Sequence, residues 1–142
     1  MSETSRRVIT LRGTPIINED NKAGEAIKPG HLLMISGGNL IKNTGNAANV
    51  ARAFALERDE FGNDIDTAYA TNDVVKVGVF HGGQRVLAFT PSGQNLAKGA
   101  RVEADNAGRL VAFSSGAVLG RVLEAADNSA GPADMRILLE II

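Results

Sequence analysis

The sequence contains no cysteine and no tryptophan, and aromatic residues occupy only 4% of its 142 positions. Without cysteine, disulfide scaffolds, zinc–thiolate sites, thiol nucleophiles and thiol redox centres are all excluded. The scarcity of aromatic rings argues against a stacking platform for sugars or for single-stranded nucleic acid. The function must therefore rest on chemistry that needs neither thiols nor extensive aromatic stacking.

The sequence also lacks an excess of charge of one sign, and it lacks long apolar runs. Lys and Arg total 15 and Asp and Glu total 16, so the formal net charge is −1. This balance argues against nucleic-acid binding by phosphate neutralisation and against a polybasic membrane-surface protein. No apolar run reaches the ~18 residues of a membrane span, and no charged-then-apolar leader precedes a cleavage site. We expect a soluble protein with no nucleic-acid or membrane partner.

What the sequence does have is glycine, with 16 residues, set between short apolar segments. Frequent turns between short apolar runs are typical of an all-β sandwich or barrel. We therefore predict an all-β fold, a small β-barrel-like or sandwich-like domain that spans residues 14–142. The predicted strands occupy residues 31–35, 39–42, 74–80, 85–90, 101–104, 110–113, 118–125 and 135–142.

Hairpins are predicted where glycine-containing turns separate two such runs. These turns are Gly37-Gly38, Gly82-Gly83 and Asn106-Ala107-Gly108. Residues 46–60 are ambiguous, because their apolar positions fit both helical spacing and strand alternation. We leave strand and helix open for that stretch.

Residues 1–13 form a locally basic segment with apolar residues between the arginines. It is either an extended N-terminal arm that orders on a partner or the first strand of the domain. As an arm, it would add a strand to a partner's sheet edge and pair its arginines with acidic groups. The candidate partner contacts are Arg6, Arg7, Val8, Ile9, Leu11 and Arg12.

The last predicted strand is apolar on both faces. A strand of this kind is usually buried on both faces, and an isolated barrel would leave one of its faces or an edge exposed to solvent. We therefore expect a homo-oligomer that buries this strand. The candidate interface residues are Ile137, Leu138, Leu139, Ile141 and Ile142.

Sequence signals for catalysis are poor. His31 and His81 both lie beside strand-like segments, and neither has a carboxylate or second histidine at metal-ligand spacing. The acidic residues between 57 and 66 do not follow the alternate spacing of a calcium loop. We predict that the protein is not an enzyme, with no catalytic residue, no cofactor and no bound metal.

One short motif has an enzymatic counterpart. Residues 65–69, Ile-Asp-Thr-Ala-Tyr, resemble the Ile-Asp-x-Asp-Tyr motif of trimeric dUTPases, in which the first Asp orients the attacking water. Here Ala68 replaces the second Asp, and the phosphate-binding Pro-Arg-Ser-Gly motif is missing. We expect a structural role instead, with Asp66 and Thr67 shaping a turn before Tyr69. As the only Tyr, Tyr69 should be at least half buried.

A broader resemblance covers roughly residues 14–142. Five stretches in a fixed order resemble capsid decoration (cement) proteins of tailed bacteriophages: residues 26–33, 54–69, 73–80, 83–88 and 119–125. The resemblance implies a small β-barrel-like protein, without catalytic activity, that clips onto the outside of an icosahedral shell. Its partners would be the major capsid protein and further copies of itself, with a trimer favoured and a dimer second.

The expected function is therefore that of a structural virion protein. It would be synthesised in the host cytoplasm, bind the capsid exterior and cement neighbouring major capsid subunits against internal pressure. Many modest interfaces would act together through effective concentration. A head–tail adaptor, or another virion structural protein, is the alternative within the same class. A trimeric dUTPase-like β-barrel hydrolase is the alternative from the enzyme class.

Overall fold

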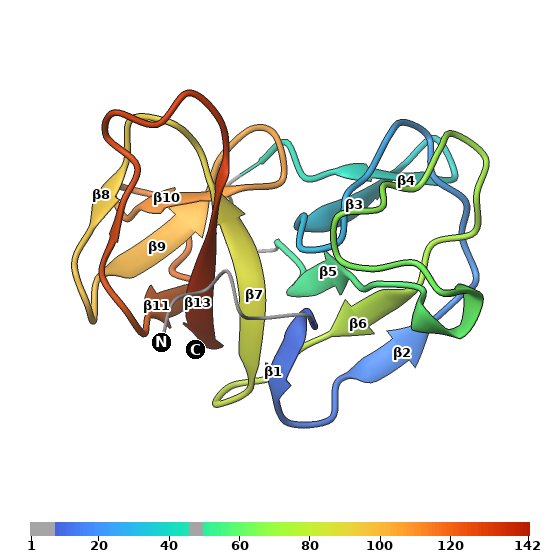
Figure 1. The fold of residues 1–142 in the computed structure, drawn as a ribbon, viewed down its shortest axis with the longest axis horizontal. Coiled ribbons are helices and arrows are strands. Elements are labelled where there is room, and N and C mark those ends of the chain that lie inside the picture. Colours follow the sequence, from blue (N-terminus) through green and yellow to red (C-terminus); the bar gives the residue numbers. More distant parts are fainter. Residues whose placement is uncertain (1–7, 46–49) are drawn as a thin grey trace.

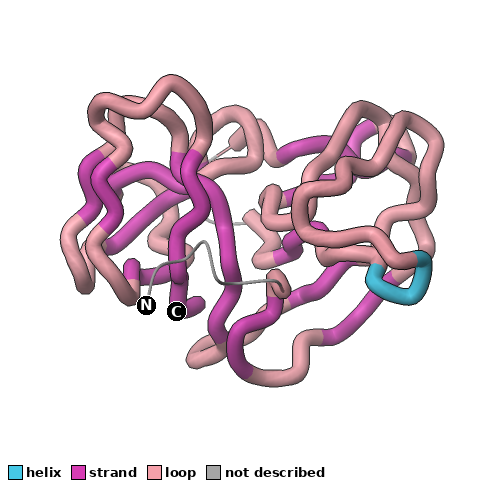
Figure 2. The backbone as a smooth tube through the Cα atoms, in the orientation of Figure 1, coloured by secondary structure: helices cyan, strands magenta, loops and turns pink. Residues whose placement is uncertain are grey.

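The computed structural model describes residues 8–45 and 50–142, and its regular structure there is nearly all β (Figure 1). The all-β prediction is therefore confirmed. A short 3₁₀ helix, η2 (Asp59–Phe61), lies between two of the strands (Figure 2). The strands are β1 (Thr10–Arg12), β2 (Ile16–Asn18), β3 (Leu33–Ser36), β4 (Asn39–Lys42), β5 (Ala53–Ala55), β6 (Val77–Val79), β7 (Arg85–Thr90), β8 (Asn95–Leu96), β9 (Arg101–Ala104), β10 (Leu110–Ala112), β11 (Gly120–Val122), β12 (Ala126–Asp127) and β13 (Met135–Ile141).

The largest sheet has six strands in the order β1-β7-β13-β11-β9-β10. Its longest pairing, between the adjacent strands β7 and β13, is antiparallel and registered over six residue pairs. The edge strands β1 and β10 do not pair with each other, so the sheet is open. The architecture is therefore sandwich-like, and the barrel in our expectation is not closed. No helix in the described part of the chain is long and apolar enough to cross a membrane.

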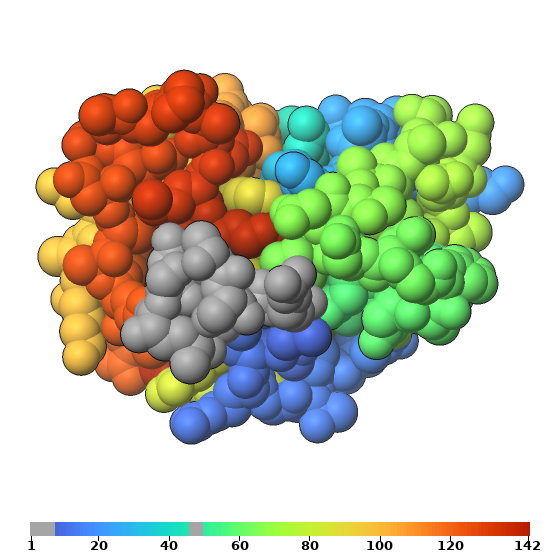
Figure 3. All heavy atoms as spheres, in the orientation of Figure 1, coloured from blue at the N-terminus to red at the C-terminus, as the bar shows by residue number. Residues whose placement is uncertain are grey.

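The molecule divides into two adjoining lobes (Figures 1 and 3). We call β1 with β7–β13 the C-terminal lobe. The N-terminal lobe contains the three-stranded sheet β2-β6-β5 and the hairpin β3–β4. A larger core joins Phe54 and Phe80 of the N-terminal lobe to Leu87 and Leu139 of the C-terminal lobe. A smaller core lies within the N-terminal lobe, so the two lobes share one core while one of them has a second.

Two predicted hairpins are confirmed and one is wrong. β3 pairs with β4 across Gly37-Gly38, and β9 pairs with β10. The Gly82-Gly83 turn, however, links two different sheets, because β6 pairs with β2 and β5 whereas β7 pairs with β1 and β13. The amide of Phe80 bonds to Arg52 in the N-terminal lobe, while the amide of Gly83 bonds to Ile141 on β13. The chain therefore changes sheets at this turn.

The ambiguous stretch contains a strand rather than an α-helix. β5 lies within it, η2 begins at its end, and residues 46–49 are outside the described residues. Phe54 on β5 packs edge-on against Phe80, with ring centroids 5.7 Å apart. Strand alternation places Phe54 in the larger core and Ala53 and Ala55 on the other face, toward the smaller core.

From residue 9 onward, the N-terminal segment is part of the domain and leads into its first strand, β1. The side chain of Ile9 is fully buried, and its carbonyl accepts a hydrogen bond from the amide of Leu87 at 2.8 Å. β1 follows directly and pairs with β7. Ile9 is therefore a core residue and not an available partner contact, whereas Val8 and Arg12 are exposed and Leu11 is partly buried. Arg6 and Arg7 lie outside the described residues.

The interface predicted at the C-terminus is corrected for four of its five residues. Ile137, Leu138, Leu139 and Ile141 are all at most 5% exposed within the single chain, and Ile142 is 52% exposed. The reason is topological: β13 lies between β7 and β11, and the chain itself covers both of its faces. These four side chains are therefore core residues and offer no surface to a second copy.

The role of Ile9 can be tested by truncation of its side chain. Ile9→Ala should lower the free energy of unfolding by about 2–5 kcal/mol, because it leaves a cavity in the larger core. Val8→Ala, one residue away at an exposed position, should change it by less than about 0.5 kcal/mol. Urea denaturation of both variants checks this, and similar small effects for the two would contradict the first-strand assignment.

Candidate functional site

The lobes are connected by the side chain of Arg136, which extends from β13 toward the N-terminal lobe. Its guanidinium donates hydrogen bonds to the carbonyl oxygens of Pro29, at 3.0 Å, and Ile65, at 2.5 Å. The same group lies 3.5 Å from the Asp66 carboxylate and 4.3 Å from the centre of the Phe89 ring. Burial lowers the pKa of Arg136 from its usual value, and Asp66 acts in the opposite direction. Arg136 thus ties two loops of one lobe to the central strand of the other.

His31 is buried at the same junction, where it contacts the Phe89 ring that Arg136 also contacts. Its ring centre lies 4.9 Å from that of Phe89, and its Nδ1 accepts a hydrogen bond from the Lys28 amide at 3.0 Å. Burial lowers the pKa of His31 to about 4, and the positive charges of Lys42 and Arg136 act in the same direction. The imidazole is therefore neutral near pH 7 and holds the Lys28 turn. His81, by contrast, is exposed.

The turn before Tyr69 is built differently from our expectation. The carboxylate of Asp64, not that of Asp66, accepts hydrogen bonds from the Asp66 amide and the Thr67 hydroxyl, both at 3.0 Å. The Asp66 carboxylate faces Arg136 instead. Tyr69 is 6% exposed, which confirms its predicted burial. Its hydroxyl donates to the carbonyl of Leu56 at 2.7 Å, and burial raises its pKa.

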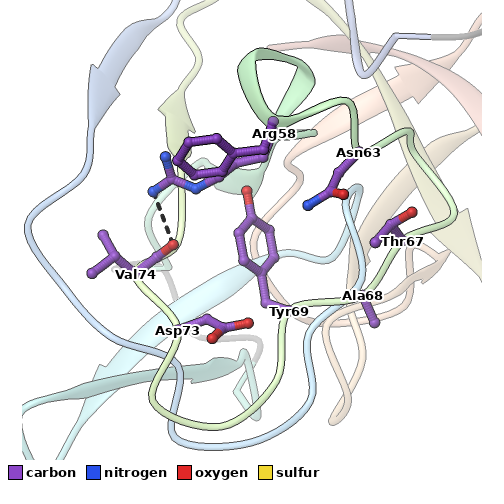
Figure 4. Close-up of a pocket in the computed structure, with 8 residues that line it drawn as sticks. Arg58, Asn63, Thr67, Ala68, Tyr69, Asp73 and Val74 are labelled. Atoms are coloured by element: carbon purple, nitrogen blue, oxygen red, sulfur yellow. Dashed lines mark hydrogen bonds between the residues drawn. The ribbon is translucent and has the colours of Figure 1, made fainter.

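A polar cleft of about 540 Å³ lies beside this turn (Figure 4). The Arg58 guanidinium stacks 5.1 Å from the centre of the Phe61 ring, donates to the carbonyl of Val74 and pairs with Glu60 at 3.0 Å. Its binding capacity is thus largely used within the protein. Asp66, the counterpart of the water-orienting Asp in the dUTPase motif, does not line the cleft. The lining residues are Arg58, Phe61, Asn63, Thr67, Ala68, Tyr69, Asp73 and Val74.

The acidic residues between 57 and 66 are drawn into ion pairs rather than gathered around a cation. Lys76 lies 3.6 Å from Asp59 and 3.4 Å from Glu60. Across residues 8–45 and 50–142, no three His, Asp or Glu side chains come together in an arrangement that could hold a metal ion.

An apolar groove of about 430 Å³ lies in the N-terminal lobe between the β3–β4 hairpin and the β2-β6-β5 sheet. Val77 and Val79 of β6 form part of its floor, and Ile35 on β3 is 58% exposed at its wall. Polar amide side chains, including those of Asn18 and Asn43, also line it. We call this feature the apolar groove.

Strand β2 borders the apolar groove and is an edge strand. Among the strands that the structure describes, it pairs only with β6, and Ile16 and Ile17 are 56% and 50% exposed. Ile16 is registered with Val79, so the two share the face that looks onto the groove. Sequence reasoning did not find this surface, although the Ile16-Ile17 pair next to Asn18 was the available signal.

Comparison with known proteins adds no family to this description. No protein-family model matches the sequence, and no curated protein matches it.

The buried His31 makes stability depend on pH. Below pH 6.5 the unfolded chain takes up a proton on this residue, whereas the folded protein does so only near its pKa of about 4. The free energy of unfolding should therefore fall as the pH is lowered through this window, by about 3 kcal/mol from this residue.

Urea denaturation between pH 7 and pH 4 checks the His31 contribution. His31→Asn, which keeps an acceptor for the Lys28 amide, should flatten the slope relative to the wild type. His81→Asn, at an exposed site, is the matched control and should keep the wild-type slope. Equal slopes for all three proteins would contradict the assignment.

Removing the Arg136 guanidinium should weaken the association of the two lobes and lower the free energy of unfolding. Arg136→Met keeps a long stem but leaves the carbonyls of Pro29 and Ile65 without this donor, which should cost about 2–4 kcal/mol of unfolding free energy. Arg101→Met, at an exposed arginine, should cost less than about 0.5 kcal/mol. A loss below 1 kcal/mol for Arg136→Met in urea denaturation would show that the lobes are held mainly by their shared core.

Proposed function

We propose that this protein is a structural virion component that binds the outer surface of an icosahedral phage capsid and cements neighbouring major capsid subunits. The observation that carries the proposal is the apolar groove with the exposed edge strand β2 beside it. Together they offer apolar surface and a strand edge that no other described strand pairs with, which are features that a protein partner recognises. The sequence resemblance to capsid decoration proteins supplies the identity of that partner.

Binding at this surface would use two kinds of contact. An extended capsid segment can add a strand to β2, where main-chain hydrogen bonds give affinity and alternate side chains give register. Apolar side chains of that segment would fill the groove against Val77, Val79 and Ile35. Each contact is modest, but many copies on one shell act together because a copy that is held at one point stays at high effective concentration for the next.

A cement must also resist deformation between its contact points. The two lobes share the larger core, and Arg136 adds hydrogen bonds between them. The antiparallel β7–β13 pair, with six registered residue pairs, lies inside the six-stranded sheet and not at its edge. This construction supports a role in which force on one lobe is passed to the other without local unfolding.

The apolar groove can be tested with a substitution at its exposed wall. Ile35→Asn should weaken attachment to purified capsids that lack this protein by at least tenfold, because it places an amide where apolar contact is needed. Phe61→Asn, which removes an apolar side chain 70% exposed near the polar cleft, is the control and should attach like the wild type. Co-sedimentation measures attachment, and circular dichroism melting checks the fold. Failure of the wild type to attach would overturn the proposed function.

A further inference from the structure

Four arginines and one glutamate form a continuous row across the six-stranded sheet. Cross-strand register places Arg12 opposite Arg85, Arg85 opposite Glu140, Glu140 opposite Arg121, and Arg121 opposite Arg101. Residues that are directly opposite each other in a regular ladder share a face, so Arg85, Glu140, Arg121 and Arg101 project from the same side. Arg12 joins the row after a register shift in β1 and lines the same cleft as Arg85. We call this row the arginine ladder. The strands that carry it, β1, β7, β13, β11 and β9, are labelled in Figure 1.

The arginine ladder breaks the usual rule for cross-strand pairs. Arg12 opposite Arg85 and Arg121 opposite Arg101 are like-charge pairs, which destabilise a sheet. Glu140 is the acidic member of the row: its carboxylate accepts bonds from Arg121 at 2.6 and 2.9 Å and lies 3.4 Å from Arg85. These arginines lower the pKa of Glu140. Side-chain arrangements that lower stability without a compensating interaction nearby are expected at functional sites.

The ends of the arginine ladder have free binding capacity. Arg12 and Arg101 are exposed, and neither forms an ion pair with any residue in 8–45 or 50–142. Arg121 uses one edge of its guanidinium on Glu140 and is 58% exposed. A guanidinium with free N–H groups binds a carboxylate through two parallel hydrogen bonds.

A cleft of about 470 Å³ adjoins the arginine ladder. Arg12 and Arg85 belong to both features, and Lys98 adds a further positive charge. Glu124 is the one acidic residue of the lining, so three positive side chains outnumber one negative side chain. The apolar part of the cleft comes from leucines, so it can take an aliphatic side chain beside the positive charges. The lining residues are Leu11, Arg12, Arg85, Lys98, Leu123, Glu124 and Leu138.

We infer that the arginine ladder and its cleft form a docking surface for an acidic, partly aliphatic segment of a partner protein. This inference rests on the proposed function, under which that partner is the major capsid protein. The ladder lies on the C-terminal lobe and the apolar groove on the N-terminal lobe. One copy would thus hold two capsid elements of different chemistry, as bridging between neighbouring subunits requires.

The chemistry favours carboxylates over the phosphates of a nucleic acid. Glu140 stands in the middle of the arginine ladder and would repel a continuous polyphosphate backbone. The whole chain carries a net charge of −1, so it lacks the long-range attraction that drives nucleic-acid binding. Separate carboxylates can instead occupy the two arginine pairs on either side of Glu140, and the leucines of the cleft add an apolar contact that phosphates would not use.

A direct binding experiment uses a fluorescent peptide of alternating Glu and Leu residues, followed by anisotropy at low salt. Arg12→Gln and Arg101→Gln should each weaken binding at least fivefold, and the double variant should weaken it more. Lys22→Gln removes one exposed positive charge from the N-terminal lobe and should bind like the wild type. Equal binding by all variants would overturn the inference. If single-stranded DNA binds as tightly as the peptide and depends on the same arginines, the inference that the surface prefers carboxylates is wrong.

Capsid co-sedimentation of the same variants separates this inference from the proposed function. Weaker attachment of the arginine variants, with a reduced dependence on salt, supports both. If the arginine variants attach to capsids as well as the wild type does, the arginine ladder has no role in attachment. The proposed function then still holds. If the wild type does not attach to capsids but binds the peptide through its arginines, the capsid is ruled out as the partner. The arginine ladder then remains a surface for an acidic segment of another protein. A change in the sedimentation of the free protein on Arg101→Gln would overturn the inference in favour of self-association.

Discussion

The guanidinium of Arg136 holds together the parts of this structure that are distant in sequence. It lies at the junction of the lobes and supplies donors to the carbonyls of Pro29 and Ile65, which belong to two separate loops. Buried carbonyls that lose their donor are costly, so both loops are held where Arg136 can reach them. The Phe89 ring packs against both Arg136 and His31, and this contact links the Lys28 turn to the same point.

This junction explains how a small protein can present two different surfaces in a constant relation. The N-terminal lobe offers the apolar groove and the edge of β2, and the C-terminal lobe offers the arginine ladder. Apolar burial gives affinity with little direction, whereas guanidinium–carboxylate pairs give register and orientation. The two kinds of contact complement each other in a protein proposed to bridge neighbouring subunits of a shell.

Turn chemistry was a good guide to the structure where a turn joined adjacent strands, and a poor guide where it did not. Gly37 and Gly38 both have positive φ angles, which suit a two-residue hairpin, and β3 and β4 pair across them. Gly82-Gly83 looked equivalent, but its flanking strands belong to different sheets. A turn residue acts on its own backbone only, while the choice of pairing partner depends on strands far away in the chain.

The sequence by itself determined the all-β class, the position of most strands and the burial of Tyr69, because alternation, turn residues and side-chain size act over a few neighbouring positions. Tertiary structure decided which apolar strand is interior. The C-terminal strand looked like an interface and became the centre of a sheet, since β7 and β11 flank it. It also decided the arginine ladder: Arg12, Arg85, Arg101 and Arg121 are separated by long stretches of chain, and only cross-strand register brings them into one row.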